Sequence, residues 1–224
     1  QKDKIKTFTS EQDIIEYGYA QIPKGIPVRV ALEEKTSGDG WAECAVRKDA
    51  GDDYDVTNGI LVYARAEFPD AETGAADHAV GSFLPQIVID GGSGIARVTK
   101  PGLDQPVGAA AINAVPRKMI RDAVDALLEE AGELRSVLVT IKIPAGVEAA
   151  KKTFNPVLGI EGGISVLGTS GIVEPMSEEA LVETIRTHLN VLKAEGRRWV
   201  IAVPGNMGAG LLQTYLKSCP GKCK

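Results

Sequence analysis

The apolar and polar positions of the chain predict short strands in its first part and alternating strands and helices in its second part. Before residue 146, apolar runs of strand length are separated by turn signals rich in glycine, proline and aspartate. These runs cover residues 28–32, 41–47, 60–66, 86–90, 95–100 and 136–143. The segment Ser-Gly-Asp-Gly at 37–40, between the first two runs, predicts a hairpin turn.

One long helix is predicted in the first part, between Pro116 and Ala131. Apolar residues recur there at spacings of three and four, namely Met119, Ile120, Ala123, Val124, Leu127 and Leu128. Pro116 suits the first helical position, where its missing N–H costs nothing, and Gly132 provides a stop signal.

The second part of the chain predicts a strand–helix–strand unit. Residues 164–167 predict a strand, Ser177 is a suitable N-cap for a helix that ends before Gly196, and residues 199–204 predict a second buried strand. A further helix is expected from Ala209 to about Lys217. Because ligands of open α/β sheets bind where parallel strands end, the glycine turns after the two strands are expected to face one crevice.

The predicted fold class is therefore an α+β N-terminal domain joined to a partial α/β domain, a Rossmann-like βαβ unit. We expect an N-terminal arm at residues 1–20, the α+β domain at 21–150 and the partial Rossmann-like domain at 151–224.

The composition leaves the predicted fold unchanged, but it disfavours several classes of function. The chain has 224 residues, 44% of them hydrophobic, and a net charge of −5, which does not favour nucleic-acid binding. No signal peptide pattern and no apolar run of membrane-spanning length is present, so we expect a cytoplasmic protein that does not bind membranes. Cys219 and Cys223 lack the partners that a zinc site needs, so no metal site is expected.

Two glycine turns are candidates for binding a cofactor. The segment 205–210 has the glycine spacing of a phosphate-binding loop, but Leu211 and Leu212 stand where Lys and Ser or Thr are required. A cofactor without a pyrophosphate fits this turn better, and a tight strand-to-helix turn without a ligand is the alternative. The segment 168–171 is one residue too short for a nucleophile elbow, and only His78 and His188 could act as its base, so serine hydrolysis is not favoured.

Charged residues supply further candidates. Asp52, Asp53 and Asp55 crowd one loop and could accept a proton, although a solvated turn is the simpler interpretation. Arg97, Lys100, Arg117 and Lys152 lie beside glycine or proline turns and could pair with substrate carboxylates, with ordinary surface charge as the alternative.

Four longer motifs follow one another in the chain, at residues 48–59, 91–102, 107–117 and 152–177. The second reads Gly-Gly-Ser-Gly-Ile-Ala-Arg-Val-Thr-Lys-Pro-Gly, and the fourth includes Thr-Phe-Asn-Pro and Leu-Gly-Thr-Ser-Gly-Ile-Val-Glu-Pro-Met-Ser. In this order they resemble the CbiD family of cobalt-precorrin-5B C1-methyltransferases, over about residues 22–210. The resemblance implies methylation at C1 of a cobalt-containing tetrapyrrole in the anaerobic route to cobalamin.

The resemblance also implies ligands and site residues. The expected methyl donor is S-adenosyl-L-methionine, with Gly168, Thr169, Ser170, Gly171, Gly205, Asn206 and Gly208 as its binding residues. The expected partner is the cobalt-containing precorrin substrate, with Arg97, Thr99, Lys100, Asn113, Arg117, Lys152 and Asn155 as its binding residues. The catalytic candidates are Asp52, Asp53 and Asp55.

The chain departs from the family pattern at both ends. Gly18 and Tyr19 lead directly into Ala-Gln-Ile-Pro, without the family's cysteine-containing segment, and no further strands follow the second glycine turn. A fragment, a divergent member and a chain completed by another subunit, including a homo-oligomer, all fit this pattern. Two other functions remain open, a non-catalytic tetrapyrrole-binding module with an incomplete donor site and a transferase for a different small molecule.

Overall fold

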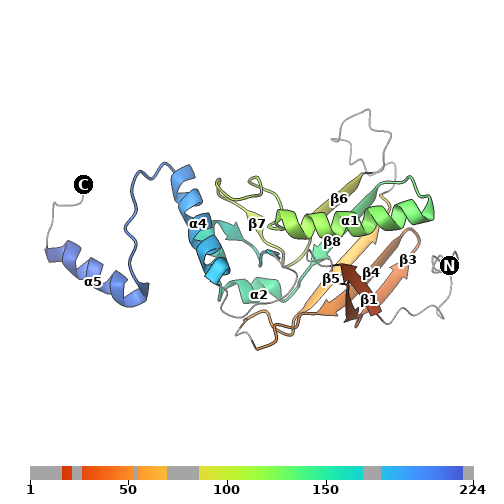
Figure 1. Ribbon diagram of the computed structural model, residues 1–224, viewed down its shortest axis with the longest axis horizontal. Coiled ribbons are helices and arrows are strands. Elements are labelled where there is room, and N and C mark those ends of the chain that lie inside the picture. Colours follow the sequence, from red (N-terminus) through yellow and green to blue (C-terminus); the bar gives the residue numbers. More distant parts are fainter. Residues whose placement is uncertain (1–16, 22–26, 53–54, 70–85, 169–177, 219–224) are drawn as a thin grey trace.

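The computed structural model describes residues 17–21, 27–52, 55–69, 86–168 and 178–218 (Figure 1). Its centre is a five-stranded mixed sheet in the order β3-β4-β5-β8-β6. The strands are β3 (Lys35–Gly38), β4 (Trp41–Arg47), β5 (Leu61–Glu67), β6 (Ile87–Gly91) and β8 (Val137–Lys142). Neighbouring strands are antiparallel except for β6 and β8, which are parallel, and β6 lies at an edge of the sheet.

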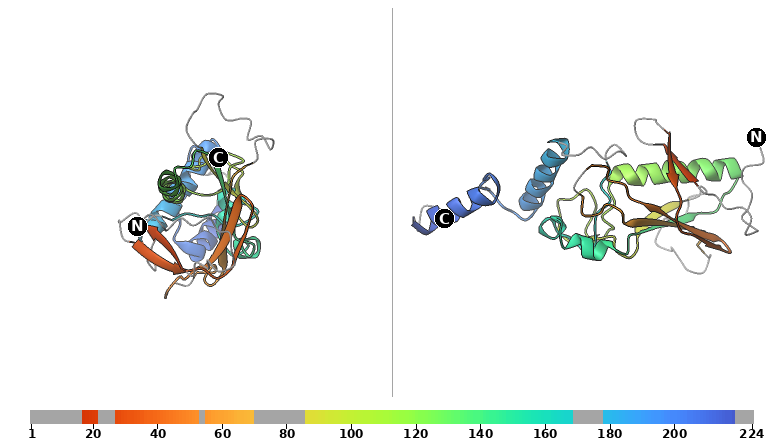
Figure 2. Two further views of the ribbon diagram at one scale, coloured as in Figure 1. Left: turned by 90° about the vertical axis from the view of Figure 1, so that its right-hand side faces the viewer. Right: turned by 90° about the horizontal axis from the view of Figure 1, so that it is seen from below.

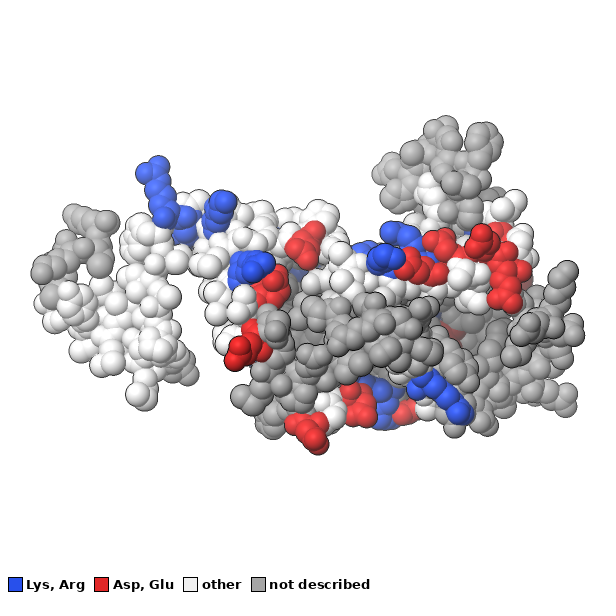
Figure 3. Space-filling model, in the orientation of Figure 1, with Lys and Arg blue, Asp and Glu red and all other residues white. Residues whose placement is uncertain are grey.

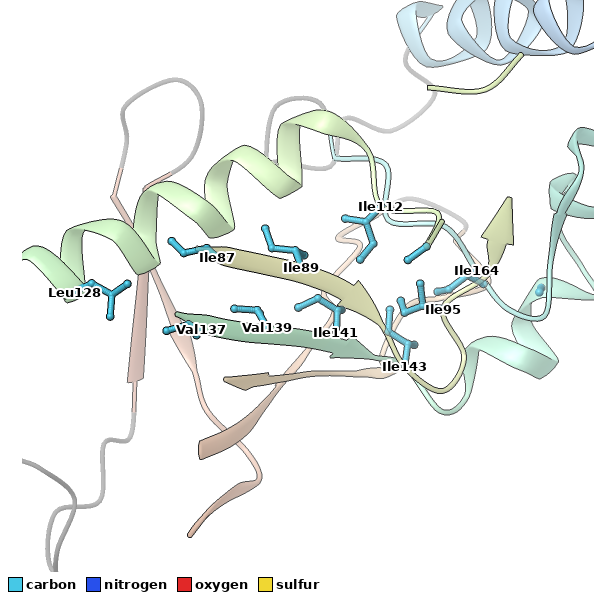
Figure 4. Close-up of a cluster of buried hydrophobic side chains, with 12 residues drawn as sticks. Ile87, Ile89, Ile95, Ile112, Leu128, Val137, Val139, Ile141, Ile143 and Ile164 are labelled. Atoms are coloured by element: carbon cyan, nitrogen blue, oxygen red, sulfur yellow. The ribbon is translucent and has the colours of Figure 1, made fainter. Parts of the chain in front are cut away.

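One face of the sheet is covered by helix α1 (Ala114–Ala131). Alternate residues of β6 and β8 are buried, as expected for strands with one face against a core. Figure 4 shows these side chains pointing toward α1, with Leu128 reaching down from the helix. The labelled core residues are Ile87, Ile89, Ile95, Ile112, Leu128, Val137, Val139, Ile141, Ile143 and Ile164.

The opposite face of the sheet is polar. Arg65 forms an ion pair with Glu67 and stacks over the Trp41 ring at 3.9 Å from its centroid, and Lys142 pairs with Glu43. Because directly paired residues of adjacent strands point to the same face, these side chains form one charged surface.

A smaller layer lies beyond the carboxyl ends of β6 and β8. It contains β7 (Arg97–Val98) paired with β9 (Ile160–Glu161), and the short helices α2 (Gly146–Ala150) and α3 (Asn155–Leu158). It has its own buried cluster, formed by Ala96, Val98, Ala111 and Ile160.

Three glycines allow this layer to approach the main sheet. A Cβ atom on Gly94 would lie 2.6 Å from the carbonyl carbon of Ile143, and Cβ atoms on Gly146 and Gly163 would both overlap the Gly94 carbonyl oxygen. The Ile164 N–H donates to the same Gly94 oxygen at 3.0 Å. Three backbone segments therefore cross here at a separation that only glycine permits, and we call this point the glycine crossing.

The C-terminal helices are α4 (Glu178–Ala194) and α5 (Gly205–Ser218). Helix α4 is anchored near its end, where Val191 is 1% exposed and Glu195 pairs with Lys100 at 3.0 Å. Helix α5 stands apart from the rest of the described chain in Figures 1 and 2. Large apolar side chains of this region are exposed, among them Leu181, Ile185, Leu189, Trp199, Met207 and Leu211.

Several sequence predictions are confirmed by these elements. The strands at 41–47, 60–66, 86–90 and 136–143, and the helices that end before Gly132 and Gly196, all form within a few residues of their predicted bounds. Both glycines have positive φ angles, of 64° and 81°, which suits a helix stop. The fold is mixed α/β. The Rossmann-like βαβ unit is not confirmed, because its second predicted strand does not form, and the domain boundaries remain predictions.

Other predictions are wrong in detail. The strand β2 (Pro27–Ala31) pairs with β1 (Tyr17–Gln21), not with β4, so the predicted hairpin turn joins β3 to β4 instead. Residues 17–20 of the predicted arm belong to β1. Helix α1 begins at Ala114, so Pro116 is its third residue and still lies in the first turn, where no N–H donor is needed.

The predicted strand at 199–204 does not form. Residues 197–203 follow α4 without strand structure, and Trp199 and Ile201 are 63% and 46% exposed. A buried strand needs a neighbouring ladder, and the described part of the chain offers none beside this run. Helix α5 then begins at Gly205, so the predicted glycine loop is the first turn of a helix.

Candidate functional site

The candidate site is centred on the edge strand β6, the turn that follows it and the start of α1. The motif residues Arg97, Asn113 and Arg117 come together here. Asn113 precedes α1 in extended conformation, and its N–H donates to Val166 O at 2.9 Å. This bond joins the start of α1 to the segment before Gly168.

The Arg117 guanidinium donates hydrogen bonds to three backbone carbonyl groups. Its Nε donates to Ile112 O at 2.8 Å, its Nη1 to Ile89 O at 2.7 Å and its Nη2 to Ala110 O at 3.2 Å. Burial lowers the pKa of Arg117, and Asp90 partly opposes that shift. The sequence predicted a substrate ligand at this position, and the structure gives Arg117 the additional task of holding three segments together.

Arg97 forms a two-pronged ion pair with Asp90. Its Nη1 and Nη2 lie 2.6 and 3.0 Å from the two carboxylate oxygens, and Nη2 also donates to Gly91 O at 2.7 Å. Partial burial raises the pKa of Asp90, but the bonds from Arg97 and from the Gly91 N–H outweigh it and leave the pKa below its ordinary value. A substrate carboxylate at Arg97 must therefore share the guanidinium with Asp90.

The remaining predicted substrate residues lie in the smaller layer. Thr99 donates from both its N–H and its hydroxyl to Gly159 O, at 2.8 and 3.0 Å. Asn155 donates to Gly163 O at 3.4 Å, and Lys100 is occupied by Glu195. Lys152 is exposed. Of the two cations among these four, Lys152 is the exposed one, whereas Lys100 is held in an ion pair.

The predicted donor site is only partly described. Gly168 has a φ of 44°, and a Cβ there would lie 3.7 Å from Pro116 at the start of α1. Thr169, Ser170 and Gly171 lie outside the described residues, as does the side chain of Asn206. Gly205 and Gly208 lie in the first turn of α5, which Figures 1 and 2 show away from α1. The described residues do not bring the two glycine segments into one crevice.

The acidic loop is held by its own hydrogen bonds. The Asp55 carboxylate accepts from Thr57 N–H at 2.7 Å and from Thr57 Oγ1 at 2.6 Å, and it pairs with Lys48. Burial raises the pKa of Asp55, and these bonds outweigh it and lower the pKa overall. Asp52 is exposed, and Asp53 lies outside the described residues. Among the described carboxylates of this loop, Asp55 therefore has a structural role.

The described ranges offer no metal site and no membrane-spanning helix. They contain no group of three or more His, Cys, Asp or Glu side chains arranged to hold a metal ion. None of their helices is both long and apolar enough to cross a bilayer. His188 is half-buried on α4, whereas His78, Cys219 and Cys223 fall outside the described residues.

An open groove of about 520 Å³ runs between α1 and the free edge of β6. Its walls are residues 86–89 of the strand and Arg117, Arg121 and Asp125 of the helix. We call it the β6 groove. Arg121 lies outside the four motifs, although its spacing of four residues from Arg117 on the predicted helix places both on one face.

Comparison with known proteins links these motifs to one family. The family model described as CbiD matches residues 7–175, which include the β6 groove, the glycine crossing and the acidic loop. This chain belongs to the CbiD family.

Curated CbiD relatives are similar over most of this chain. The cobalt-precorrin-5B C(1)-methyltransferase of Thermoanaerobacter sp. is 45% identical over 202 residues, covering 90% of this chain and 50% of that protein. The protein of the same description from Ruminiclostridium cellulolyticum is 47% identical over 186 residues, covering 83% and 45%. The chain thus spans about half the length of the curated relatives that it matches.

A solved structure of the CbiD family has a related fold. The crystal structure of cobalamin biosynthesis protein (cbiD) from Archaeoglobus fulgidus is 26% identical, with a TM-score of 0.51, and covers 79% of this chain and 51% of that one. The mixed sheet with α1 on one face is therefore a CbiD fold.

Proposed function

We propose that this chain takes part in the S-adenosyl-L-methionine-dependent C1-methylation of cobalt-precorrin-5B in cobalamin biosynthesis. The observation that carries the proposal is the identity of 45–47% with proteins described as cobalt-precorrin-5B C(1)-methyltransferase, over 83–90% of this chain. We place the reaction in the cytoplasm.

The reaction requires alignment more than side-chain chemistry. A methyl group passes from the sulfonium sulfur to C1 of the macrocycle; the C–C bond forms as the S–C bond breaks, and sulfur keeps the bonding electrons. No protein nucleophile is needed, so holding donor and acceptor together can supply a large share of the acceleration, on the order of 7–11 kcal/mol at best.

The donor residues that we propose are those of the two glycine segments, Gly168, Thr169, Ser170, Gly171, Gly205, Asn206 and Gly208. Backbone N–H groups at such turns allow close approach of a ligand. If both segments serve one donor, α5 must move toward the start of α1 or act from another copy of the chain. Its exposed apolar residues Met207 and Leu211 are consistent with a partner surface.

The substrate residues that we propose are Arg97, Thr99, Lys100, Asn113, Arg117, Lys152 and Asn155. The substrate carries acetate and propionate arms, and guanidinium and ammonium groups are their natural partners. Lys152 is exposed, and Arg97 retains a side chain that is 43% exposed beside Asp90. Among the cations of the set, Lys152 and Arg97 are therefore the most accessible to a carboxylate.

The test is methyl transfer from isotope-labelled S-adenosyl-L-methionine to cobalt-precorrin-5B. Product formation by this chain, or by this chain together with the remaining half of a relative, supports the proposal. Tetrapyrrole binding without turnover in both experiments supports the alternative, a binding module with an incomplete donor site. The absence of both binding and turnover contradicts both functions.

A further inference from the structure

The outer edge of β6, which pairs with no other strand of the described residues, presents mainly hydrogen-bond donors. Gln86 O and Gly92 N bond to β8, and residues of a parallel strand alternate between the two sides. The backbone groups of Ile87, Ile89 and Gly91 therefore point to the open side. Two of their carbonyl groups are already used, because Arg117 donates to Ile89 O and Arg97 donates to Gly91 O, both at 2.7 Å.

This pattern suits an anion better than an additional strand. A strand that extends a sheet needs donors and acceptors in alternation. The carbonyl oxygens of Ile89 and Gly91 are occupied by Arg117 and Arg97, so the Ile89 N–H is left beside two guanidinium groups. Only the Ile87 end of the edge keeps both a donor and an acceptor.

Arg121 supplies a cation that the protein itself does not neutralise. It lies one turn after Arg117 in the β6 groove and is exposed, and its side chain forms no ion pair or hydrogen bond within the described chain. Lys118 on the same helix is different, since it pairs with Asp122 at 2.5 Å. The positive charges of Arg117 and Arg121 are close enough that Arg121 contributes to lowering the pKa of Arg117, after the larger effect of burial.

The charged side chains of α1 are placed unfavourably with respect to the helix dipole. The first turn has no acidic residue and the last turn no basic residue. Figure 3 shows basic side chains toward the start of α1 and acidic ones toward its end. This order places positive side chains at the positive end of the dipole, which costs stability and concentrates positive potential beside the Ile89 N–H.

We propose that the β6 groove binds a carboxylate group, with Arg121 as its ionic partner and the Ile89 N–H as a backbone donor. Asp125 lies one turn further along the groove and repels an anion, so it confines the carboxylate to the end near Arg117. The proposal rests on the proposed function for its ligand, one of the carboxylate arms of the tetrapyrrole. Arg121 is then a binding residue additional to those identified in the motifs.

Uroporphyrin, a tetrapyrrole with acetate and propionate arms, is the first probe. Its binding to the full chain is measured by fluorescence quenching for the native protein and for R121A, D125N and K118A. We expect R121A to weaken binding about tenfold and D125N to tighten it by about twofold to fivefold. K118A is the matched control, because Lys118 is 75% exposed on the same helix and does not line the groove.

Glutarate is the second probe, followed through the backbone amide signals of Ile87 and Ile89 in NMR spectra. If glutarate shifts the Ile89 amide signal and the shift disappears in R121A, the carboxylate site is supported. If uroporphyrin nevertheless fails to bind, only the tetrapyrrole is contradicted as the ligand of that site. Uroporphyrin binding that is equal in R121A and native protein, with no glutarate shift at Ile89, overturns the site and leaves the proposed function standing. Circular dichroism verifies that each variant is folded.

Discussion

The Nη1 atom of Arg117 lies 2.7 Å from the carbonyl oxygen of Ile89, so the start of α1 is tied directly to the middle of the edge strand. The same guanidinium holds the carbonyl groups of Ala110 and Ile112, which belong to the segment entering the helix. One side chain thus fixes the helix, its approach and the sheet edge relative to one another.

Replacing Arg117 by Met is expected to destabilise the protein by about 2–4 kcal/mol, because three partly buried carbonyl groups lose their donors. Arg117→Lys is expected to recover part of this loss, since an ammonium group has no planar fork to reach all three. Urea unfolding followed by circular dichroism measures the difference. Arg121→Met is the control and is expected to change stability by no more than about 0.5 kcal/mol; equal losses in both Met variants would contradict this role of Arg117.

Gly94→Ala is expected to prevent stable folding or to cost more than about 4 kcal/mol. The new Cβ would lie 2.6 Å from the Ile143 carbonyl carbon, and the φ of 76° is itself unfavourable for alanine. Thermal unfolding and the yield of soluble protein are the measurements. Gly210→Ala, which meets no atom within 4 Å on helix α5, is expected to be neutral or slightly stabilising. A stable Gly94→Ala protein with unchanged melting would show that the glycine crossing is not as tight as described.

The ion pair between Asp90 and Arg97 predicts a dependence of stability on pH. The pKa of Asp90 is lowered in the folded protein, so its contribution is present above the unfolded pKa of about 3.9 and is lost as pH falls through the folded pKa. The difference in unfolding free energy between native protein and Asp90→Asn should therefore shrink as pH falls below about 4. Denaturant unfolding at several pH values measures it. A difference that stays constant down to pH 2 would contradict the lowered pKa.

Gly102→Ala is expected to release α4 without unfolding the sheet. Its Cβ would lie 2.6 Å from the Asn190 carbonyl oxygen, at the place where Val191 is buried. Hydrogen exchange should then accelerate in α4 and remain unchanged in β8. Gly108→Ala is a matched control, because its φ of 90° resembles the 99° of Gly102 while no atom lies within 4 Å of its Cβ. Equal acceleration of α4 in both variants would assign the effect to backbone strain and not to helix contact.

Sequence reasoning succeeded where a segment carries its own signal. Helix α1 has apolar residues at helical spacing and a glycine stop, and β6 and β8 are bounded by turn residues, so local patterns sufficed. Sequence reasoning failed where pairing with another segment of the chain determines the structure. Strand β3 is exposed along its whole length and has no apolar pattern, and it forms because the following turn brings it to β4.

At the candidate site, too, some features have a local sequence signal and others depend on contacts between distant segments. The family motifs led to this region as the candidate site, but spacing alone could not reveal that Arg117 bonds to three carbonyl groups or that Arg97 is shared with Asp90. The apolar run at Trp199 illustrates the reverse case, since its composition suits a strand while no ladder is available beside it in the described chain. Pairing depends on distant segments, and a single sequence does not show which ones meet.

The glycine crossing also bears on how quickly this protein reaches its native state. Gly94 is far along the chain from Gly146 and Gly163, so a long loop must close before their backbones can meet. We expect this junction to consolidate late in folding, after α1 and the β4–β5 pair. Until then, we expect β7, β9 and α2 to lack a fixed place, so the chain should present to chaperones and proteases a longer-lived intermediate than its size alone would suggest.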